Sequence, residues 1–262
     1  MSDTPSVPTA AAPLPSGAAM PLLGFGTWRL SGDAARRATA EALAAGYRHV
    51  DTATMYGNER EVGAAVREAG RGGVFVTTKL PPDHAGRERE TLEQSLEQLG
   101  LDVVDLWLVH WPPGNAGIGV WERFVAARQD GLVRDIGVSN YSLAQIDELD
   151  RATGVRPAVN QVPWSPLRFD APLLQAHRDR DVVLEGYSGL KGGTIEHPVV
   201  TGIAGRLGRT PAQVVVRWHL QHGVVVIPKS SSPERIRANA DVDGFTLGDD
   251  DMAALDRLGS AA

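Results

Sequence analysis

Short apolar runs rich in β-branched residues alternate with longer segments of helical period along almost the whole chain. Because parallel neighbours in a sheet need a crossover connection, this alternation predicts a parallel sheet in an α/β protein. Two of the expected helices, at 33–46 and 88–100, end on Gly46 and Gly100, as helices commonly do. Eight runs are expected to be strands: 22–26, 47–51, 74–79, 103–110, 133–140, 157–161, 181–187 and 223–229.

Eight strand–helix units in about 240 residues are typical of a closed (β/α)8 barrel, the TIM barrel. The competing fold is an open doubly wound sheet, which should carry a glycine-rich turn after its first strand. The only candidate for that turn, GFGTW at 24–28, has a bare GxG and no long helix directly behind it. We therefore predict a single-domain barrel over residues 17–262, preceded by a flexible, proline-broken tail at residues 1–16.

Charge and composition exclude several classes of protein. Lys and Arg number 26 against 32 for Asp and Glu, so the net charge of -6 would repel nucleic acid and acidic membranes. The absence of cysteine excludes disulfides, thiolate catalysis and cysteine-ligated metal. No apolar run approaches the roughly 20 residues of a membrane helix, and the N-terminus does not resemble a signal peptide. We expect a cytoplasmic monomer that acts on a small molecule, without nucleic acid or membrane partners.

Polar side chains stand where the expected strands end. In barrels of this kind the active site lies at the carboxyl ends of the strands, so residues that close an apolar run are candidates for chemistry. Any one of these residues could be an ordinary solvated loop residue. Several polar residues at the same end of the barrel favour an active site. The candidates are Asp51, Lys79, His110, Asn140, Gln161, Tyr187 and Lys229.

Tyr56, in the segment DTATMYGNE, joins three of these candidates behind the second expected strand. A tyrosine with a pKa near 10 is a poor acid at neutral pH unless its phenolate is stabilised. The ammonium of Lys79 would stabilise it, and the carboxylate of Asp51 could hold the lysine in place. With a neutral His110 as hydrogen-bond donor, these residues form a plausible proton-delivery unit.

The segments GYRHVDTATMYGNE, VFVTTKL, DLWLVHWP, IGVSN, VNQV and VVVIPKSSSPERI occur in this order between residues 20 and 258. Together they resemble the aldo-keto reductase superfamily, in its bacterial, 2,5-diketo-gluconate reductase-like branch. The resemblance implies a (β/α)8 barrel and NAD(P)H-dependent reduction of a carbonyl substrate without metal or flavin. It places the family's catalytic tetrad on Asp51, Tyr56, Lys79 and His110.

In the mechanism that the resemblance implies, the nicotinamide donates a hydride to the carbonyl carbon and Tyr56 protonates the developing alkoxide. His110 would position the carbonyl oxygen and donate a hydrogen bond to it. Lys79, paired with Asp51, would lower the pKa of Tyr56.

The resemblance also implies NADPH as the cofactor. It places the nicotinamide carboxamide near IGVSN and VNQV, an aromatic ring against the nicotinamide face, and the pyrophosphate under the loop SGLKGG at 188–193. A helix N-terminus with basic residues behind the eighth strand suits the 2′-phosphate. The implied cofactor contacts are Ser139, Asn140, Gln161, Tyr187, Ser188, Leu190, Lys229, Ser230, Arg235 and Asn239.

The sequence departs from the family's pattern at several positions. Gly189 replaces the proline usual in the pyrophosphate loop, and Ala238 stands where many relatives carry a glutamate that holds the adenosine. In NQVPWSP, residues Pro163, Trp164 and Ser165 replace the Glu, Tyr and His of the commoner NQVEYHP.

Trp28 and Trp111 are expected to wall an aromatic substrate pocket, with a purely structural role as the alternative for each. The link HWPPGNAGIGVWERF is short, and the chain stops at Ala262 without the tail that many relatives fold over the substrate. We therefore expect an open mouth and loose specificity for small aldehydes, α-ketoaldehydes or ketones.

Two functions from other classes remain open. The first is a non-catalytic NADP(H)-binding sensor or scaffold on the same barrel, because a fold does not prove activity. The second is a metal-dependent barrel hydrolase, which would need clusters of histidine and carboxylate at the strand ends. His219 and His222 could be a metal pair, but no third ligand lies nearby in sequence, so we assign them and His49 to packing or surface roles and expect no metal.

Overall fold

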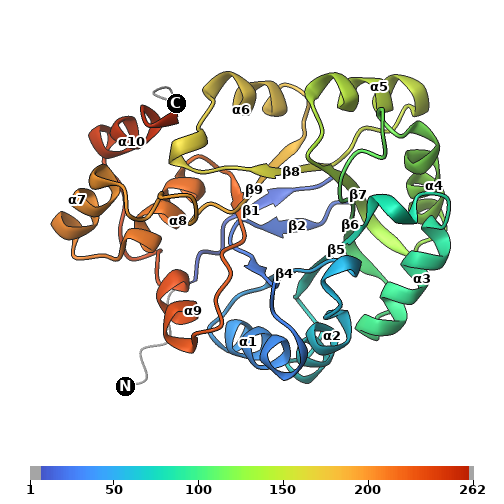
Figure 1. Ribbon diagram of the computed structural model, residues 1–262, viewed down its shortest axis with the longest axis horizontal. Coiled ribbons are helices and arrows are strands. Elements are labelled where there is room, and N and C mark those ends of the chain that lie inside the picture. The colour runs from blue at the N-terminus through green and yellow to red at the C-terminus, as the bar shows by residue number, and fades with distance from the viewer. Residues whose placement is uncertain (1–6, 260–262) are drawn as a thin grey trace.

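Eight parallel strands follow one another around a single sheet in the computed structural model, which describes residues 7–259. A parallel bridge between Leu23 and Val226 joins the first of these strands to the last, so the sheet closes into a barrel (Figure 1). The predicted (β/α)8 barrel is confirmed, and the open doubly wound sheet is excluded. The strands are β3 (Phe25–Gly26), β4 (His49–Asp51), β5 (Phe75–Leu80), β6 (Val104–Val109), β7 (Val133–Ser139), β8 (Val159–Pro163), β9 (Val183–Tyr187) and β10 (Val225–Val226).

Helices surround the strands on the outside of the barrel (Figure 1). Local signals in the sequence set several of their ends: Ser142 with Gln145 and Thr210 with Gln213 form capping boxes, and Gly100 ends a helix in the left-handed conformation. The helices are α1 (Gly32–Ala44), α2 (Glu59–Glu68), α3 (Glu88–Leu99), α4 (Ile118–Gln129), α5 (Leu143–Thr153), α6 (Ala171–Arg178), α7 (Pro198–Leu207), α8 (Pro211–Gln221), α9 (Pro233–Ala240) and α10 (Asp249–Asp256). No helix within residues 7–259 is both long and apolar enough to cross a membrane.

Apolar side chains fill the barrel and the space between its strands and helices. Strand residues such as Val50, Trp107 and Ile136 pack outward against the helices, while Leu106, Leu108 and others pack inside the barrel. The inside cluster consists of Leu14, Met20, Leu22, Phe75, Leu106, Leu108, Ala158, Val159 and Val225. A few polar side chains share this interior, and they form the base of the site described below.

A short hairpin precedes the barrel, which corrects the expectation of a flexible tail at residues 1–16. Strand β1 (Ala11–Pro13) pairs antiparallel with β2 (Ala19–Pro21), and both lie across the middle of the barrel in Figure 1. Leu14 joins the inside cluster, and the backbone N–H of Ser16 donates to Asp135 at 3.1 Å. The expectation is therefore wrong for residues 11–16, because apolar side chains of the hairpin bury themselves in the barrel. Residues 1–6 lie outside the described residues.

Candidate active site

One cavity of about 320 Å³ lies at the carboxyl ends of the strands. Among the residues expected from the sequence, Lys79 lies buried below the cavity, and Ser230, Arg235 and Asn239 lie beyond its edge at α9. The remaining expected residues line it: Trp28, Asp51, Tyr56, His110, Trp111, Ser139, Asn140, Gln161, Tyr187, Ser188, Leu190 and Lys229.

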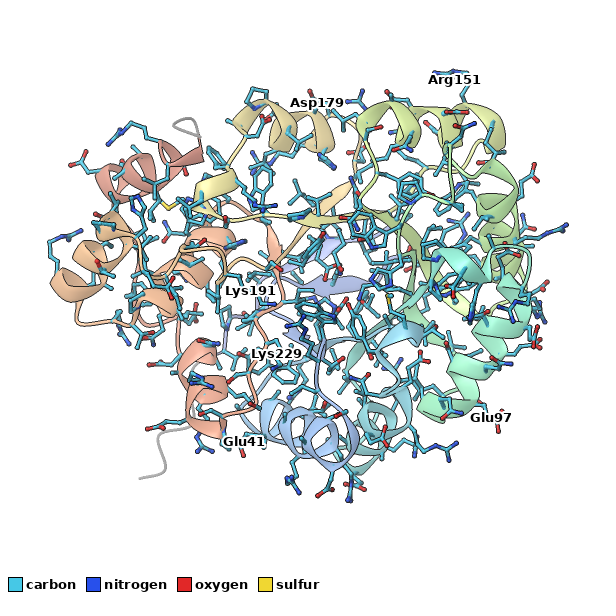
Figure 2. All side chains as sticks on the ribbon, in the orientation of Figure 1. Glu41, Glu97, Arg151, Asp179, Lys191 and Lys229 are labelled. Atoms are coloured by element: carbon cyan, nitrogen blue, oxygen red, sulfur yellow. The ribbon has the colours of Figure 1, made fainter. Side chains whose placement is uncertain are left out.

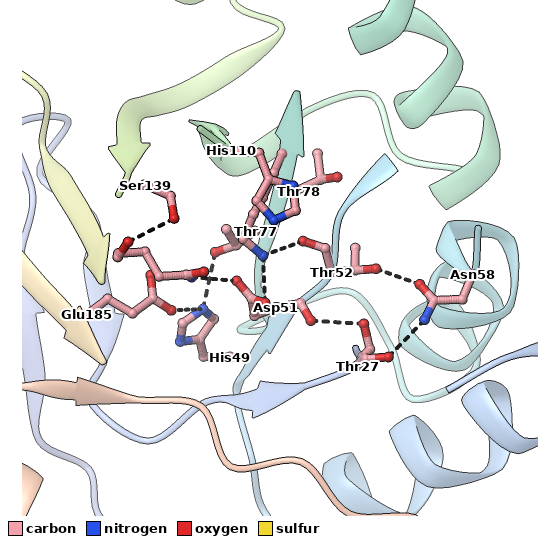
Figure 3. A network of polar contacts seen from close by, with 12 residues as sticks. Thr27, His49, Asp51, Thr52, Asn58, Thr77, Thr78, His110, Ser139 and Glu185 are labelled. Atoms are coloured by element: carbon pink, nitrogen blue, oxygen red, sulfur yellow. Dashed lines mark hydrogen bonds and ion pairs between the residues drawn. The ribbon is translucent and has the colours of Figure 1, made fainter. Parts of the chain in front are cut away.

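Lys79 and Asp51 form a buried ion pair at the base of the cavity (Figure 3). The Lys79 Nζ donates to Asp51 Oδ1 at 2.7 Å and to the carbonyl oxygen of Thr52 at 2.7 Å. The other oxygen of Asp51 accepts a hydrogen bond from Gln161 Nε2 at 2.9 Å. Burial alone would lower the pKa of Lys79, but Asp51 and then Tyr56 outweigh it, and the pKa is raised. The lysine is therefore a fixed cation under the cavity.

Tyr56 ends the short 3-10 helix η1 (Thr54–Tyr56) and reaches over this pair. The Lys79 Nζ lies 5.2 Å from the centre of the Tyr56 ring. Burial raises the pKa of Tyr56 more than Lys79 lowers it, so the lowering expected from the sequence is present but outweighed. The phenol therefore carries its proton at neutral pH, and Lys79 is close enough to stabilise the phenolate left after donation.

His110 packs edge-on against Tyr56, with ring centres 5.8 Å apart. Burial, followed by the charge of Lys79, lowers the pKa of His110 to about 3. Since a neutral imidazole carries one N–H, His110 can donate a hydrogen bond to an oxygen in the cavity without bringing a charge. Its Nδ1 is buried and has no hydrogen-bond partner among the described residues.

Ser139, Asn140 and Tyr187 form a connected wall beside His110, whose carbonyl oxygen accepts a hydrogen bond from Asn140 Nδ2 at 3.1 Å. The Tyr187 hydroxyl donates to Asn140 Oδ1 at 2.8 Å, and Asn140 Nδ2 donates to Ser139 Oγ at 3.0 Å. Asn140 has a φ of 64°, a left-handed conformation that asparagine tolerates better than most residues. Gln161 links this wall to Asp51, so the wall and the ion pair form one network.

The start of α9 gathers polar and basic groups beside the cavity. Ser232 caps the helix by accepting from the backbone N–H of Arg235 at 3.3 Å. The Arg235 side chain donates from Nε to Ser230 Oγ, also at 3.3 Å, and Lys229 lines the cavity. A helix N-terminus with a guanidinium and an ammonium beside it suits a phosphate.

Two further cations, Lys191 at the cavity and Arg29 next to it, were not predicted from the sequence. Both lie against the ring of Trp28, with Lys191 Nζ 4.0 Å and Arg29 Cζ 4.3 Å from its centre. Burial lowers the pKa of Lys191, and the charges of Arg29 and Lys229 lower it further. Within residues 7–259, none of Arg29, Lys191 and Lys229 forms an ion pair with an acid. Figure 2 shows Lys191 and Lys229 near each other beside the barrel centre, where an anion would relieve their repulsion.

Three large apolar side chains are exposed among the described residues, and all three line the cavity. Trp28 is 41% exposed, Met55 58% and Trp111 46%. The two tryptophans were expected from the sequence, whereas Met55 was not, although it directly precedes Tyr56. Together they form an apolar rim at the cavity mouth.

Two of the positions noted in the sequence, Trp164 and Gly189, both lie against His219. Trp164 is buried against Phe169, with ring centres 5.8 Å apart, and does not line the cavity. A Cβ at Gly189 would lie 2.9 Å from His219 Cε1 and 3.2 Å from the Trp164 carbonyl oxygen. A side chain at Gly189 would therefore collide with His219. Nothing in the structure explains Ala238.

His219 in α8 and His222, which directly follows that helix, make separate polar contacts. His219 Nδ1 lies 2.8 Å from the carbonyl oxygen of Val215, and His222 Nε2 lies 2.8 Å from Asp256 Oδ1. The part of the chain that the structure describes contains no group of three His, Cys, Asp or Glu residues that could hold a metal ion.

Comparisons with known proteins cover nearly the whole chain. The family model described as "Aldo/keto reductase family" matches residues 22–204 and 198–260. An aldo-keto reductase of Mycolicibacterium vanbaalenii is 47% identical over 246 residues, which are 91% of this chain and 88% of that protein. Morphine 6-dehydrogenase of Pseudomonas putida is 43% identical over 265 residues, 94% of this chain and 90% of its own. A solved structure of a Bombyx mori aldo-keto reductase in complex with NADP has a TM-score of 0.88 at 32% identity, covering 97% of this chain and 93% of that one.

Proposed function

The chain belongs to the aldo/keto reductase family, a family of oxidoreductases, and on this premise we propose that it is an NADPH-dependent carbonyl reductase. Its substrates would be small aldehydes, α-ketoaldehydes or ketones, with Tyr56 as the general acid. The observation that carries the proposal is the meeting of Tyr56 and neutral His110 in one cavity above the buried Lys79–Asp51 pair.

NADPH would supply the hydride that adds to the carbonyl carbon. Tyr56 keeps its proton at neutral pH and can give it to the carbonyl oxygen as negative charge develops there. His110 donates a second hydrogen bond to the same oxygen, because both side chains face the cavity. Lys79 stabilises the phenolate that remains, and Asp51 keeps Lys79 charged and oriented.

The cofactor would lie from the Ser139–Asn140–Tyr187 wall to the start of α9. The wall offers hydroxyl and amide groups to the nicotinamide end, and Gln161, Ser188 and Leu190 lie beside it. Lys229, Ser230, Arg235 and Asn239 surround the α9 end, which supports a site for the adenosine 2′-phosphate. The Bombyx mori relative was solved in complex with NADP, which agrees with this choice.

Arg29 and Lys191 add positive charge between these two ends. Because both lie against the Trp28 ring and have no acidic partner within the described residues, we assign them to the pyrophosphate. The apolar rim of Trp28, Met55 and Trp111 would then contact the substrate. One relative is named morphine 6-dehydrogenase, so the activity test described next also includes alcohol oxidation.

The function is tested by mixing the wild-type protein with NADPH or NADH and a panel of carbonyl compounds that begins with methylglyoxal. We expect NADPH consumption with several small aldehydes and weaker turnover with NADH. Tight NADPH binding without turnover in either direction would instead support the sensor or scaffold. A protein that binds neither nucleotide would contradict the assignment of the α9 end. Light scattering of the purified protein tests the proposed monomer, and cell fractionation tests the proposed cytoplasmic location.

A further inference from the structure

Glu185 is a fully buried carboxyl group that the proposed mechanism does not use. It lies in β9, points into the barrel, and neither of its carboxyl oxygens has a hydrogen-bond partner among the described residues. Its nearest basic group is His49, whose Nε2 lies 3.9 Å from Glu185 Oε1 (Figure 3). An ionised carboxylate without partners is strongly disfavoured in such a place, so its protonation state needs an explanation.

The barrel interior around Glu185 contains one cation and two carboxyl groups. Lys79 is committed to Asp51 through a 2.7 Å contact. Gln161 and Val225 lie beside Glu185 on the neighbouring strands, and neither side chain is charged. The Gln161 amide lowers the pKa of Glu185 less than burial and Asp51 raise it. The ionisable groups that face it are His49 and Asp51 from β4, Lys79 from β5, and Tyr56 from η1.

His49 cannot provide the missing positive charge at neutral pH. Burial lowers the pKa of His49 to about 4, and its Nε2 also lies 3.1 Å from the Thr77 hydroxyl. Burial, followed by repulsion from Asp51, raises the pKa of Glu185 to about 8. The charges of Lys79 and Asp51 therefore cancel while Glu185 holds a proton. When Glu185 ionises, the net charge of the three groups becomes -1.

We propose that Glu185 is a positioning residue for the proton of Tyr56: it is neutral at pH 7, and its ionisation at alkaline pH helps to keep the phenol protonated. Gln161 lies beside Glu185 in the sheet and donates to Asp51, which pairs with Lys79 only 5.2 Å from the centre of the Tyr56 ring. An anionic Glu185 would therefore add negative charge around Lys79 and make the Tyr56 phenolate less favourable. Carbonyl reduction would thus persist to higher pH than Lys79 and Asp51 alone allow. This inference rests on the proposed reductase function.

The kinetic test compares the pH dependence of kcat for carbonyl reduction in the wild type and in Glu185→Gln, at saturating NADPH and substrate. Glutamine keeps the shape of a neutral acid but cannot ionise. At pH 6 to 7 we expect the two kcat values to agree within about twofold, since one neutral group replaces another. The alkaline fall in kcat should move to lower pH in the variant, by roughly half a pH unit to one unit.

Asp135→Asn is the matched control. Asp135 is also a buried acid inside the barrel, but it binds Ser16 at the hairpin end, so its replacement should leave the pH profile in place. Superimposable profiles for Glu185→Gln and the wild type would overturn the proposal. An equal shift in both variants would also overturn it, because the effect would then not belong to Glu185.

An infrared measurement on the same proteins needs no turnover. With isotope-labelled glutamate, the carbonyl stretch of a protonated carboxyl should be present in the wild type at pH 7, disappear as the pH rises above neutrality, and be missing in Glu185→Gln. A wild-type spectrum without a titrating band of this kind overturns the proposal even if the variant does not fold. Because this readout does not depend on catalysis, a failure of the reductase function is distinguished from a failure of the role of Glu185.

Discussion

Lys79 has no exposed side-chain surface, and its ammonium binds Asp51 and the carbonyl oxygen of Thr52. Removing one member of such a pair leaves the other as an uncompensated buried charge, whereas removing both charges is often nearly neutral for stability. The stability of the barrel and the chemistry of its site are therefore coupled through this residue.

Lys79→Met should lose activity and stability together. We expect kcat to fall by a factor on the order of 10² to 10⁴, because Tyr56 loses the charge that stabilises its phenolate. Unfolding by urea should show a loss of about 3–5 kcal/mol, because Asp51 is left without its cation. The double variant Asp51→Asn/Lys79→Met should recover most of the stability and none of the activity. Recovery of activity in the double variant would contradict the role given to Lys79.

Helix α9 carries two arginines whose roles can be compared. Arg235 lies at the N-terminal turn beside Ser230, while Arg237 pairs with Glu41 on α1. Only the first should contact the 2′-phosphate.

Arg235→Ala should raise the KM for NADPH by about tenfold to a hundredfold, the effect of losing a hydrogen bond between charged groups. The KM for NADH should stay nearly constant, because NADH has no 2′-phosphate. Arg237→Ala is the control, and steady-state kinetics with both cofactors give the comparison. An equal rise for NADH and NADPH would show that Arg235 does not select the phosphate.

Lys191, in the loop after β9, should affect the binding of both cofactors and not of NADPH alone. Lys191→Ala should raise the KM for NADPH and for NADH by similar factors, since the pyrophosphate is common to both. The rise should shrink as salt is added, because exposed charges are screened. If Lys191→Ala changes neither KM at low salt, Lys191 and Arg29 do not face the phosphates.

The apolar periodicity of the sequence placed all eight barrel strands within a few residues, because the strands are mostly buried and most of them lie within apolar runs. The β1–β2 hairpin escaped prediction, since its strands are only three residues long and contain proline. Lys191 was missed because the loop pattern pointed to small residues and backbone groups. Glu185 was missed because it sits inside the apolar run DVVLEGY, and only closure of the barrel places it near His49 and Asp51.

Burial of neutral histidines makes the free energy of unfolding of the whole chain depend on pH. Four buried histidines have a lowered pKa in the folded chain: His49, His110, His177 and His219. Below pH 6.5 the unfolded chain binds protons at these positions that the folded chain does not. Glu59 and Glu185 act in the opposite direction, because their raised pKa values mean that the folded chain holds the extra proton.

Since the four histidines outnumber the two glutamates, the free energy of unfolding should fall as the pH is lowered from 6.5 towards 4. Urea unfolding at pH 7, 6 and 5 checks this, with a reversible transition at each pH as the requirement. Stability that stays constant or rises between pH 7 and pH 5 would contradict the neutral state assigned to these histidines.

The role of Tyr56 as the proton donor in carbonyl reduction can be tested in a single-turnover experiment. NADPH is bound to the wild type and to Tyr56→Phe, its Kd is measured by fluorescence, and oxidation is then started with excess methylglyoxal at pH 7. We expect a similar Kd for both proteins and a rate of NADPH oxidation lower by a factor on the order of 10² to 10⁴ in the variant. A variant that binds NADPH normally and oxidises it at the wild-type rate would contradict the assignment of Tyr56 as the acid.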